Sequence, residues 1–340
     1  MTPPLFAECQ KVAELSGATA DTFRAEIASR ARPLVLRGAV SDWPLVKRAA
    51  QSPQALVDYL SSFVSSELVD TVIAPRAARG RLLYEDGFAD LNHRHTIEKL
   101  PHVLKGLLKQ MEADQPIGIS IQGLSAAEHL KGLEQDNPTD FVPPGTAARL
   151  WIGNAVTVAP HFDAADNLAC VAAGRRRFIL FPPEQVANLY VGPFDITPAG
   201  VPVSTVPLDD PDLERWPRYR DALAAAQVAE LEAGDAIYIP YLWWHGVQSL
   251  ARFNLLVNFW WYGDRIAAQH PFGALMRACH VLFGNMPPEH RAAWRSIYDH
   301  YVFAPDAATF AHLPDHLRDP REPSAEALAE FKEAIAKLFQ

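Results

Sequence analysis

Residues 116–262 constrain the fold most, because short apolar runs alternate there with Pro and Gly turns. Each run has the length and the β-branched or aromatic content of a strand, and the turn residues bound it. Many short strands punctuated in this way predict an all-β sandwich or barrel. The predicted strands cover residues 117–121, 148–153, 167–172, 177–181, 236–240 and 253–261.

The segment 182–230 is a long insertion between two of these strands, rich in Pro and acidic residues. Residues 222–231 within it have a helical pattern. We therefore expect one helix there, outside the β-core.

The sequence on either side of the predicted core has apolar residues mainly at helical spacing. We divide the chain into an N-terminal mixed α/β region (1–115), an all-β sandwich or barrel core (116–263) and a C-terminal helical region (264–340). The fold class is thus mainly β with helices. Predicted helices cover 21–29, a segment starting at Ser52-Pro53, 97–111, 272–283, 288–301 and 324–339, and predicted strands cover 33–38 and 68–73.

Composition excludes several classes of protein. The net charge is −9 and the longest basic run is Arg175–Arg177, which argues against a duplex nucleic-acid partner. The three cysteines are far apart and in no CxxC spacing, which indicates a reducing compartment. No apolar run reaches the roughly 20 residues of a membrane span, and the N-terminus lacks the pattern of a signal peptide. We expect a cytoplasmic protein that does not enter a membrane.

The motif His161-Phe162-Asp163, followed by a distant His245, is the strongest chemical signal. Residues i and i+2 of a strand point to the same face, so His161 and Asp163 can bind one ion side by side. Two histidines and one carboxylate form the facial triad that holds Fe(II) and leaves positions open. The alternative for His245 alone is a hydrogen-bonded core histidine. With the upstream motif present, the metal interpretation is favoured.

With these motifs, the chain resembles the JmjC-type, or cupin-like, oxygenases that depend on Fe(II) and 2-oxoglutarate. Within that family, its motifs are most similar to those of the asparaginyl hydroxylase branch. The resemblance covers about residues 20–265. It implies a double-stranded β-helix with iron at its open end, bound by His161, Asp163 and His245. The motifs that carry it are His161-Phe-Asp163, Asn167, Gly174-Arg-Arg, Phe178-Ile-Leu-Phe-Pro-Pro183 and Trp243-Trp-His245.

The resemblance also implies a site for 2-oxoglutarate. Arg176 takes the place of the basic residue that binds the distal carboxylate, and a guanidinium suits a carboxylate. Arg175 and Arg177 alternate to the other face and are interpreted as solvated. Five further residues are predicted to contact the cosubstrate: Thr157, Asn167, Asn258, Ser120 and Gln122. Thr157 can reach it only if the strand contains a bulge. Asn167 and Asn258 are explained equally well as structural amides. The predicted pocket wall consists of Trp243, Trp244 and Trp151.

The sequence and the resemblance therefore predict a dioxygenase that uses 2-oxoglutarate and O2 to hydroxylate a C–H bond, and we favour a protein or peptide side chain as the substrate. A small molecule is the alternative class of substrate. One alternative is a metal-dependent cupin enzyme that does not use 2-oxoglutarate, and the other is a degenerate cupin that only binds. His93 and His95 are interpreted as surface histidines. The helices after about residue 264 are expected to form a homodimer interface.

Overall fold

The computed structural model describes residues 4–194, 196–198, 201–261, 272–306, 308–314, 329–330 and 332–333. The chain divides into two compact units, Met1–Gly273 and Ala274–Gln340. The predicted regions 1–115 and 116–263 both belong to the first unit. Within the described residues, no helix is long and apolar enough to cross a membrane.

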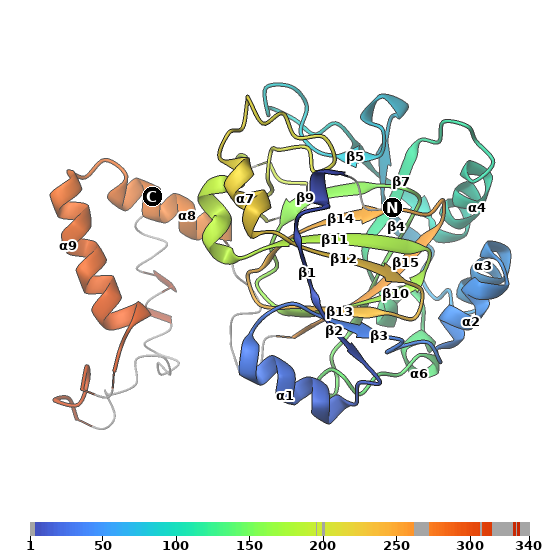
Figure 1. Cartoon of the computed structure of the whole chain (residues 1–340), viewed down its shortest axis with the longest axis horizontal. Coiled ribbons are helices and arrows are strands. Elements are labelled where there is room, and N and C mark those ends of the chain that lie inside the picture. Colours follow the sequence, from blue (N-terminus) through green and yellow to red (C-terminus); the bar gives the residue numbers. More distant parts are fainter. Residues whose placement is uncertain are drawn as a thin grey trace. The chain divides into compact units, whose positions relative to one another are not determined.

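Two β-sheets form the first unit, and strands run across its middle in Figure 1. The predicted mainly-β fold with helices is confirmed. The six-stranded sheet has the order β1 (Gln10–Lys11), β12 (Gln227–Glu232), β11 (Arg175–Phe181), β14 (Trp244–Ser249), β9 (Thr157–His161), β5 (Arg81–Leu82). The nine-stranded sheet has the order β2 (Ala13–Ser16), β3 (Leu34–Arg37), β13 (Ala236–Ile239), β10 (Asp166–Ala173), β15 (Asn254–Trp261), β8 (Ala148–Gly153), β7 (Gly118–Ser125), β4 (Leu68–Ala74), β6 (Arg94–Lys99).

Strand β10 shows why the core is apolar on both faces of the large sheet. Leu168 and Cys170 belong to the hydrophobic cluster that contains the N-terminal helices. Ala169 and Val171 belong to a second cluster with Phe178 of the other sheet. Because side chains alternate along a strand, one face of β10 meets the helices and the other meets the opposite sheet. This explains why the sequence of β10 is an almost continuous buried run.

The turn between β10 and β11 requires a glycine. Gly174 has φ +77°, and a Cβ there would lie 2.4 Å from Asn254 Oδ1 and 2.6 Å from the Phe253 carbonyl oxygen. Both contacts are too close for any other residue. The turn fixes the register of β11, and therefore which of its three arginines faces inward.

Helices cover the periphery of this unit, as Figure 1 shows for α1 to α4. Thr19 closes a capping box at the start of α1, and the Ser52 side chain accepts a hydrogen bond from the Ala55 backbone at the start of α3. The helices of this unit are α1 (Ala20–Arg30), α2 (Pro44–Gln51), α3 (Pro53–Ser61), α4 (Leu100–Gln110), α5 (Ala126–His129), α6 (Leu133–Asp136) and α7 (Tyr219–Ala225), with 3-10 turns at Pro4–Phe6, Arg76–Ala78 and Pro183–Asn188.

Two predicted helices are partly strand. Residues 97–99 belong to β6, which pairs with β4, and α4 begins only at Leu100, followed by Pro101. Residues 227–231 belong to β12, which pairs with β11, whereas α7 ends at Ala225. In both places pairing with a distant strand overrides the local helical pattern. Helix α2 was not predicted.

The second unit contains all of α8 (Phe272–Phe283) but its first two residues, together with α9 (Pro288–Tyr298) and a π-helical turn (Asp299–Phe303). Phe283 contacts Trp294 and Tyr298, with ring centroids 5.5 Å and 5.9 Å apart. The predicted helix 288–301 is α-helical only as far as Tyr298 and continues as the π-helical turn. The predicted helix 324–339 lies outside the described residues except for positions 329, 330, 332 and 333.

Candidate active site

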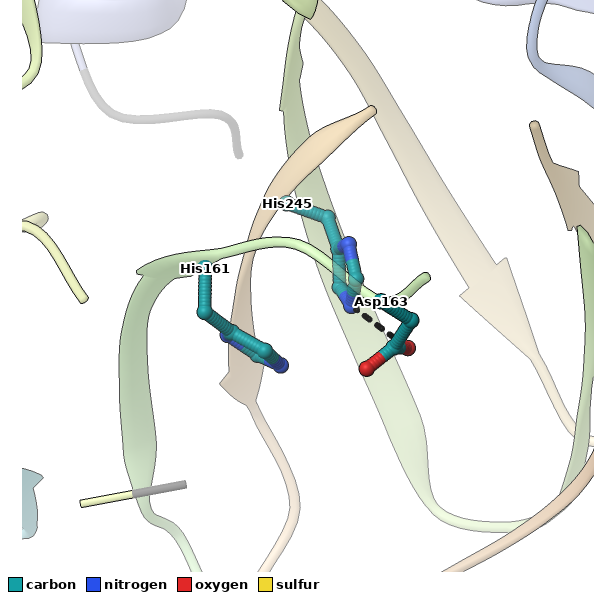
Figure 2. A group of neighbouring side chains, drawn as sticks. All are labelled: His161, Asp163 and His245. Atoms are coloured by element: carbon teal, nitrogen blue, oxygen red, sulfur yellow. Dashed lines mark ion pairs between the residues drawn. The ribbon is translucent and has the colours of Figure 1, made fainter. Parts of the chain in front are cut away.

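His161, Asp163 and His245 come together at one end of the six-stranded sheet. His161 is the last residue of β9 and lies directly opposite His245 of β14, and Asp163 follows just beyond the strand end. One ligand atom from each residue lies within 4.8 Å of the others. Figure 2 shows the three side chains pointing toward one another. The geometry therefore provides the three-ligand set that the sequence predicted.

Both histidines are oriented by backbone carbonyls. His161 Nδ1 lies 2.9 Å from the Ala159 oxygen, and His245 Nδ1 lies 3.1 Å from the Trp243 oxygen. A carbonyl only accepts, so each Nδ1 carries the proton and each Nε2 is free to bind a metal. Burial, followed by the neighbouring His161, lowers the pKa of His245 to about 4. The imidazole is therefore neutral at pH 7, as metal binding requires.

Asp163 is held by two donors that act on the same carboxylate oxygen. Trp260 Nε1 donates to Asp163 Oδ2 at 3.1 Å, and Asn167 Nδ2 donates at 3.3 Å. Asn167 in turn accepts from Asn258 Nδ2 at 2.9 Å. The sequence analysis missed Trp260, although its spacing of two from Asn258 on β15 places both on one face of that strand.

A cavity of about 450 Å³ adjoins the triad. Arg176 lines it, is only 6 % exposed, and donates through Nη2 to the Trp151 oxygen at 3.2 Å. Among the residues that the structure describes, its Nε has no hydrogen-bond partner. Burial lowers the pKa of Arg176 to about 9.

A buried cation without an anion is costly, and a bound carboxylate would offset that cost. The residues present thus fit both groups that the resemblance implies. The triad supplies the ligand atoms for Fe(II), and Arg176 supplies the donor for a carboxylate of 2-oxoglutarate.

The predicted site residues divide into two groups. Gln122, Trp151, Asn167, Arg176 and Asn258 line the cavity with the triad. The structure places Ser120, Thr157, Trp243 and Trp244 outside that lining.

A bulge in β9 explains the position of Thr157. His245 is opposite His161, but Val247 is opposite Val158, so β9 has one extra residue between them. The bulge that the sequence analysis required is present, and it brings Val158 to the cavity instead of Thr157. The cosubstrate role of Thr157 has no support from this geometry.

The predicted tryptophan wall also differs. Trp243 and Trp244 belong to two separate hydrophobic clusters, and Trp244 packs edge-on against Phe162 with centroids 4.9 Å apart. The tryptophans that line the cavity are Trp151 and Trp260, whose ring centroids are 5.3 Å apart.

The prediction that Arg177 is solvated is wrong. Arg177 is buried on the outer face of β11, where its Nη2 lies 2.8 Å from Glu230 Oε1 and its Nη1 donates to Gln248 Oε1 at 2.9 Å. Arg175 is exposed, as predicted. Arg176 and Arg177 are thus both buried, but only Arg177 has an acidic partner among the described residues.

The two histidines of the His93-Arg94-His95 motif differ. His95 is exposed, lines the outer part of the cavity and bonds Asp70 Oδ2 at 2.8 Å. His93 is buried, which corrects the interpretation as a surface residue, and burial lowers its pKa to about 4.

Comparison with known proteins agrees with this geometry. The family described as "Cupin-like domain" matches residues 19–265. The lysine-specific demethylase JMJ31 of Arabidopsis thaliana is 31% identical over 204 residues, which cover 58% of this chain and 33% of the demethylase. The tRNA wybutosine-synthesizing protein 5 of Gallus gallus is 25% identical over 83% of this chain and 91% of that protein. The human bifunctional peptidase and (3S)-lysyl hydroxylase JMJD7 is 26% identical over 68% of this chain and 77% of its own length.

The chain belongs to the cupin-like family, within the JmjC class of Fe(II)- and 2-oxoglutarate-dependent oxygenases. The predicted enzyme class and its dependence on iron and 2-oxoglutarate are confirmed at the level of this family.

Proposed function

We propose that this protein hydroxylates a C–H bond in a side chain of a protein or peptide, using Fe(II), O2 and 2-oxoglutarate. The observation that carries the proposal is the buried Arg176, which has no acidic partner among the described residues and lies in the same cavity as the triad. A cupin that does not use 2-oxoglutarate has no need for such a cation. A cupin that only binds has no need for an open three-ligand metal site.

The residues have separate tasks in this reaction. Iron, when bound, supplies the oxygen chemistry, with 2-oxoglutarate as the reductant that leaves as succinate and CO2. His161, Asp163 and His245 hold the metal, and Trp260 and Asn167 fix the Asp163 carboxylate. Arg176 binds the distal carboxylate and so orients the keto acid.

The apolar lining keeps water away from the reacting groups. Val158, Phe178, Ile239, Val247 and Leu256 line the same cavity as Arg176. They give the charged cosubstrate a low-dielectric environment in which Arg176 binds it more strongly than water would allow. A dry cavity also protects reactive species from side reactions.

The substrate class is the finer part of the proposal. JMJD7 is named as a lysyl hydroxylase and JMJ31 as a lysine-specific demethylase, whereas wybutosine-synthesizing protein 5 is named for tRNA. A net charge of −9 opposes binding of a polyanion. We therefore favour a polypeptide over tRNA. The cytoplasmic address stays a prediction from cysteine usage.

Succinate production tests the proposed activity. Purified protein with added Fe(II), 2-oxoglutarate and ascorbate should form succinate only in the presence of O2, and a chelator should abolish the reaction. Pyruvate in place of 2-oxoglutarate is the matched control, because it lacks the distal carboxylate that Arg176 would bind. Equal turnover of pyruvate would contradict the role of Arg176, and no turnover of either acid would contradict the proposed function.

We also propose a homodimer formed through the second unit. Its helices α8 and α9 and the π-helical turn Asp299–Phe303 expose several large apolar side chains, namely Val281, Leu282, Trp294, Ile297, Tyr298, Tyr301, Val302 and Phe303. An isologous two-fold interface would cover such a face. Light scattering should give a mass of twice the 37.6 kDa chain mass. The double variant Trp294→Glu/Ile297→Glu should have the mass of a single chain. A wild-type protein that is monomeric at micromolar concentration would contradict the dimer.

A further inference from the structure

Three large apolar residues are exposed among the described residues of the Met1–Gly273 unit: Leu68 (58 %), Ile97 (64 %) and Val186 (50 %). Leu68 and Ile97 lie on the paired strands β4 and β6, whereas Val186 lies in the 3-10 turn Pro183–Asn188. An isolated exposed apolar residue needs no explanation, but two on one ladder form a local apolar surface.

The register places these two residues beside the mouth of the cavity. Ile97 is directly opposite Asp70, and Leu68 is opposite Lys99, so Leu68 and Ile97 are diagonal neighbours on one face. Asp70 and His95 are two residues away from Leu68 and Ile97 along the same strands, and both line the cavity. Two residues of strand span about 7 Å. Ile97 therefore lies beside the cavity mouth, next to Asp70, and Leu68 lies about 7 Å further along β4, on the face that leads into the cavity.

The other face of β4 is already covered. Val69 packs in the hydrophobic cluster with the outer helices. Further along the mouth-side face, Val72 is also buried, in a cluster with Leu82 and Val156. The exposed part of this face thus begins where the cavity opens and continues outward over Leu68 and Ile97. Among the described residues, β6 is also the last strand of its sheet, with almost every residue exposed.

We propose that Leu68 and Ile97 form a docking surface for an extended polypeptide substrate, and that they bind an apolar side chain two to four residues from the residue that is hydroxylated. This inference rests on the proposed function. An extended segment running from the apolar pair to the cavity mouth covers about 7 Å in two residues, so the apolar side chain and the target side chain belong to one short stretch of chain.

The chemistry of the surface favours a polypeptide over a nucleic acid. Aliphatic side chains offer a phosphate backbone no hydrogen bond, and nucleic acids are held mainly through contacts to phosphate and sugar. At the inner edge of the pair, the Asp70 carboxylate bonds His95 and would repel a phosphate. A peptide can instead place an apolar side chain on Leu68 and Ile97 and pair its backbone with an exposed strand edge.

The test uses short synthetic peptides with a central Lys or Asn in a Gly/Ser background, each with one Leu moved through the flanking positions. The enzyme variants are Leu68→Thr/Ile97→Thr, which keeps strand-forming residues, and Val186→Thr as the matched control for loss of an exposed apolar residue elsewhere. Hydroxylation is measured as kcat/KM by mass spectrometry, and succinate formed without peptide is measured in the same preparations. Thermal melts show whether each variant is folded.

We expect wild-type protein and Val186→Thr to prefer peptides with Leu two to four residues from the centre. In Leu68→Thr/Ile97→Thr this preference should fall by about tenfold, the usual effect of losing an apolar contact with substrate. A wild-type protein that makes no succinate overturns the proposed function itself.

Three outcomes overturn the docking surface while leaving the proposed function in place. One is succinate formation that no peptide in the set stimulates, and another is an undiminished Leu preference in the double variant. The third is a lower mass of the double variant in light scattering, which would make this face a contact between copies of the chain. Hydroxylation of unmodified tRNA with no peptide turnover would overturn both the docking surface and the proposed polypeptide substrate.

Discussion

The inner end of the cavity and its mouth carry opposite kinds of unsatisfied group, Arg176 on the six-stranded sheet and the pair Leu68 and Ile97 on the nine-stranded sheet. At the inner end, Arg176 is a buried cation whose Nε has no partner in the described part of the chain. At the mouth, Leu68 and Ile97 are apolar residues exposed to water. Each is unfavourable in the protein alone, because burial penalises charge and water penalises apolar surface. The comparison teaches that the inner end suits a small anion, and the mouth suits an apolar side chain.

The metal ligands should show the largest effect. Asp163→Ala removes the only anionic ligand, so Fe(II) affinity, measured anaerobically, should fall by more than about 100-fold, because loss of outer partners alone costs up to that much. His161→Ala and His245→Ala should likewise abolish succinate formation. Glu184→Ala, at an exposed carboxylate, is the control. Wild-type turnover in all three ligand variants would show that the triad is misassigned.

Arg176→Met should have the second-largest effect. It separates an effect on binding of 2-oxoglutarate from an effect on the stability of the fold. The apparent KM for 2-oxoglutarate should rise about 30-fold or more, as expected when a buried charge partner is removed. The melting temperature of the ligand-free protein should not fall, because Met replaces an uncompensated buried charge. Arg175→Met, at the exposed neighbour, should leave both quantities unchanged. If Arg175 proves to be the sensitive position, the register of β11 is wrong.

Trp260→Phe should have an intermediate effect. It keeps most of the aromatic wall but removes the indole donor to Asp163 Oδ2. Metal affinity should weaken about tenfold, within the range for loss of a hydrogen bond to a ligating residue. The control is Trp151→Phe, which removes an indole from the same wall without touching Asp163. Equal metal affinities for these two variants would mean that the Trp260 hydrogen bond does not position the ligand.

Arg177→Ala should affect stability and leave binding of 2-oxoglutarate alone. The variant loses charge-assisted hydrogen bonds to Glu230 and Gln248, which should lower the free energy of unfolding by about 1–3 kcal/mol. Urea denaturation measures this loss. The KM for 2-oxoglutarate should stay at the wild-type value, because Arg177 is on the outer face of β11. A raised KM would place Arg177 in the cosubstrate site.

The parts of this protein that were predictable from sequence depend on short-range pattern. The Gly and Pro residues between apolar runs predicted the strands, and the His161-x-Asp163 spacing predicted the metal site. Arg176 was assigned from the resemblance to the oxygenase family, and alternation along the strand separated it from Arg175 and Arg177. The C-terminal homodimer and the substrate class were also predicted from sequence, and they stay proposals.

The missed features depend on pairing between distant segments. Residues 227–231 were predicted as helix, so Glu230 was not recognised as the partner that buries Arg177. The bulge in β9 decides whether Thr157 or Val158 faces the cavity, and the sequence shows only that an extra residue exists. Leu68 and Ile97 become neighbours only through the register of β4 and β6.

The central claim is that one cavity holds both a metal bound by the triad and a keto acid anchored by Arg176. Anaerobic titration of the Fe(II)-loaded protein with 2-oxoglutarate tests it, because chelation of iron by the keto acid produces charge-transfer absorption in the visible range. We predict a saturable absorption band in the wild-type protein, the same band at much higher 2-oxoglutarate concentration in Arg176→Met, and no band in Asp163→Ala. A wild-type protein that binds Fe(II) but shows no absorption change with 2-oxoglutarate, or a titration that Arg176→Met leaves unaltered, would contradict the claim.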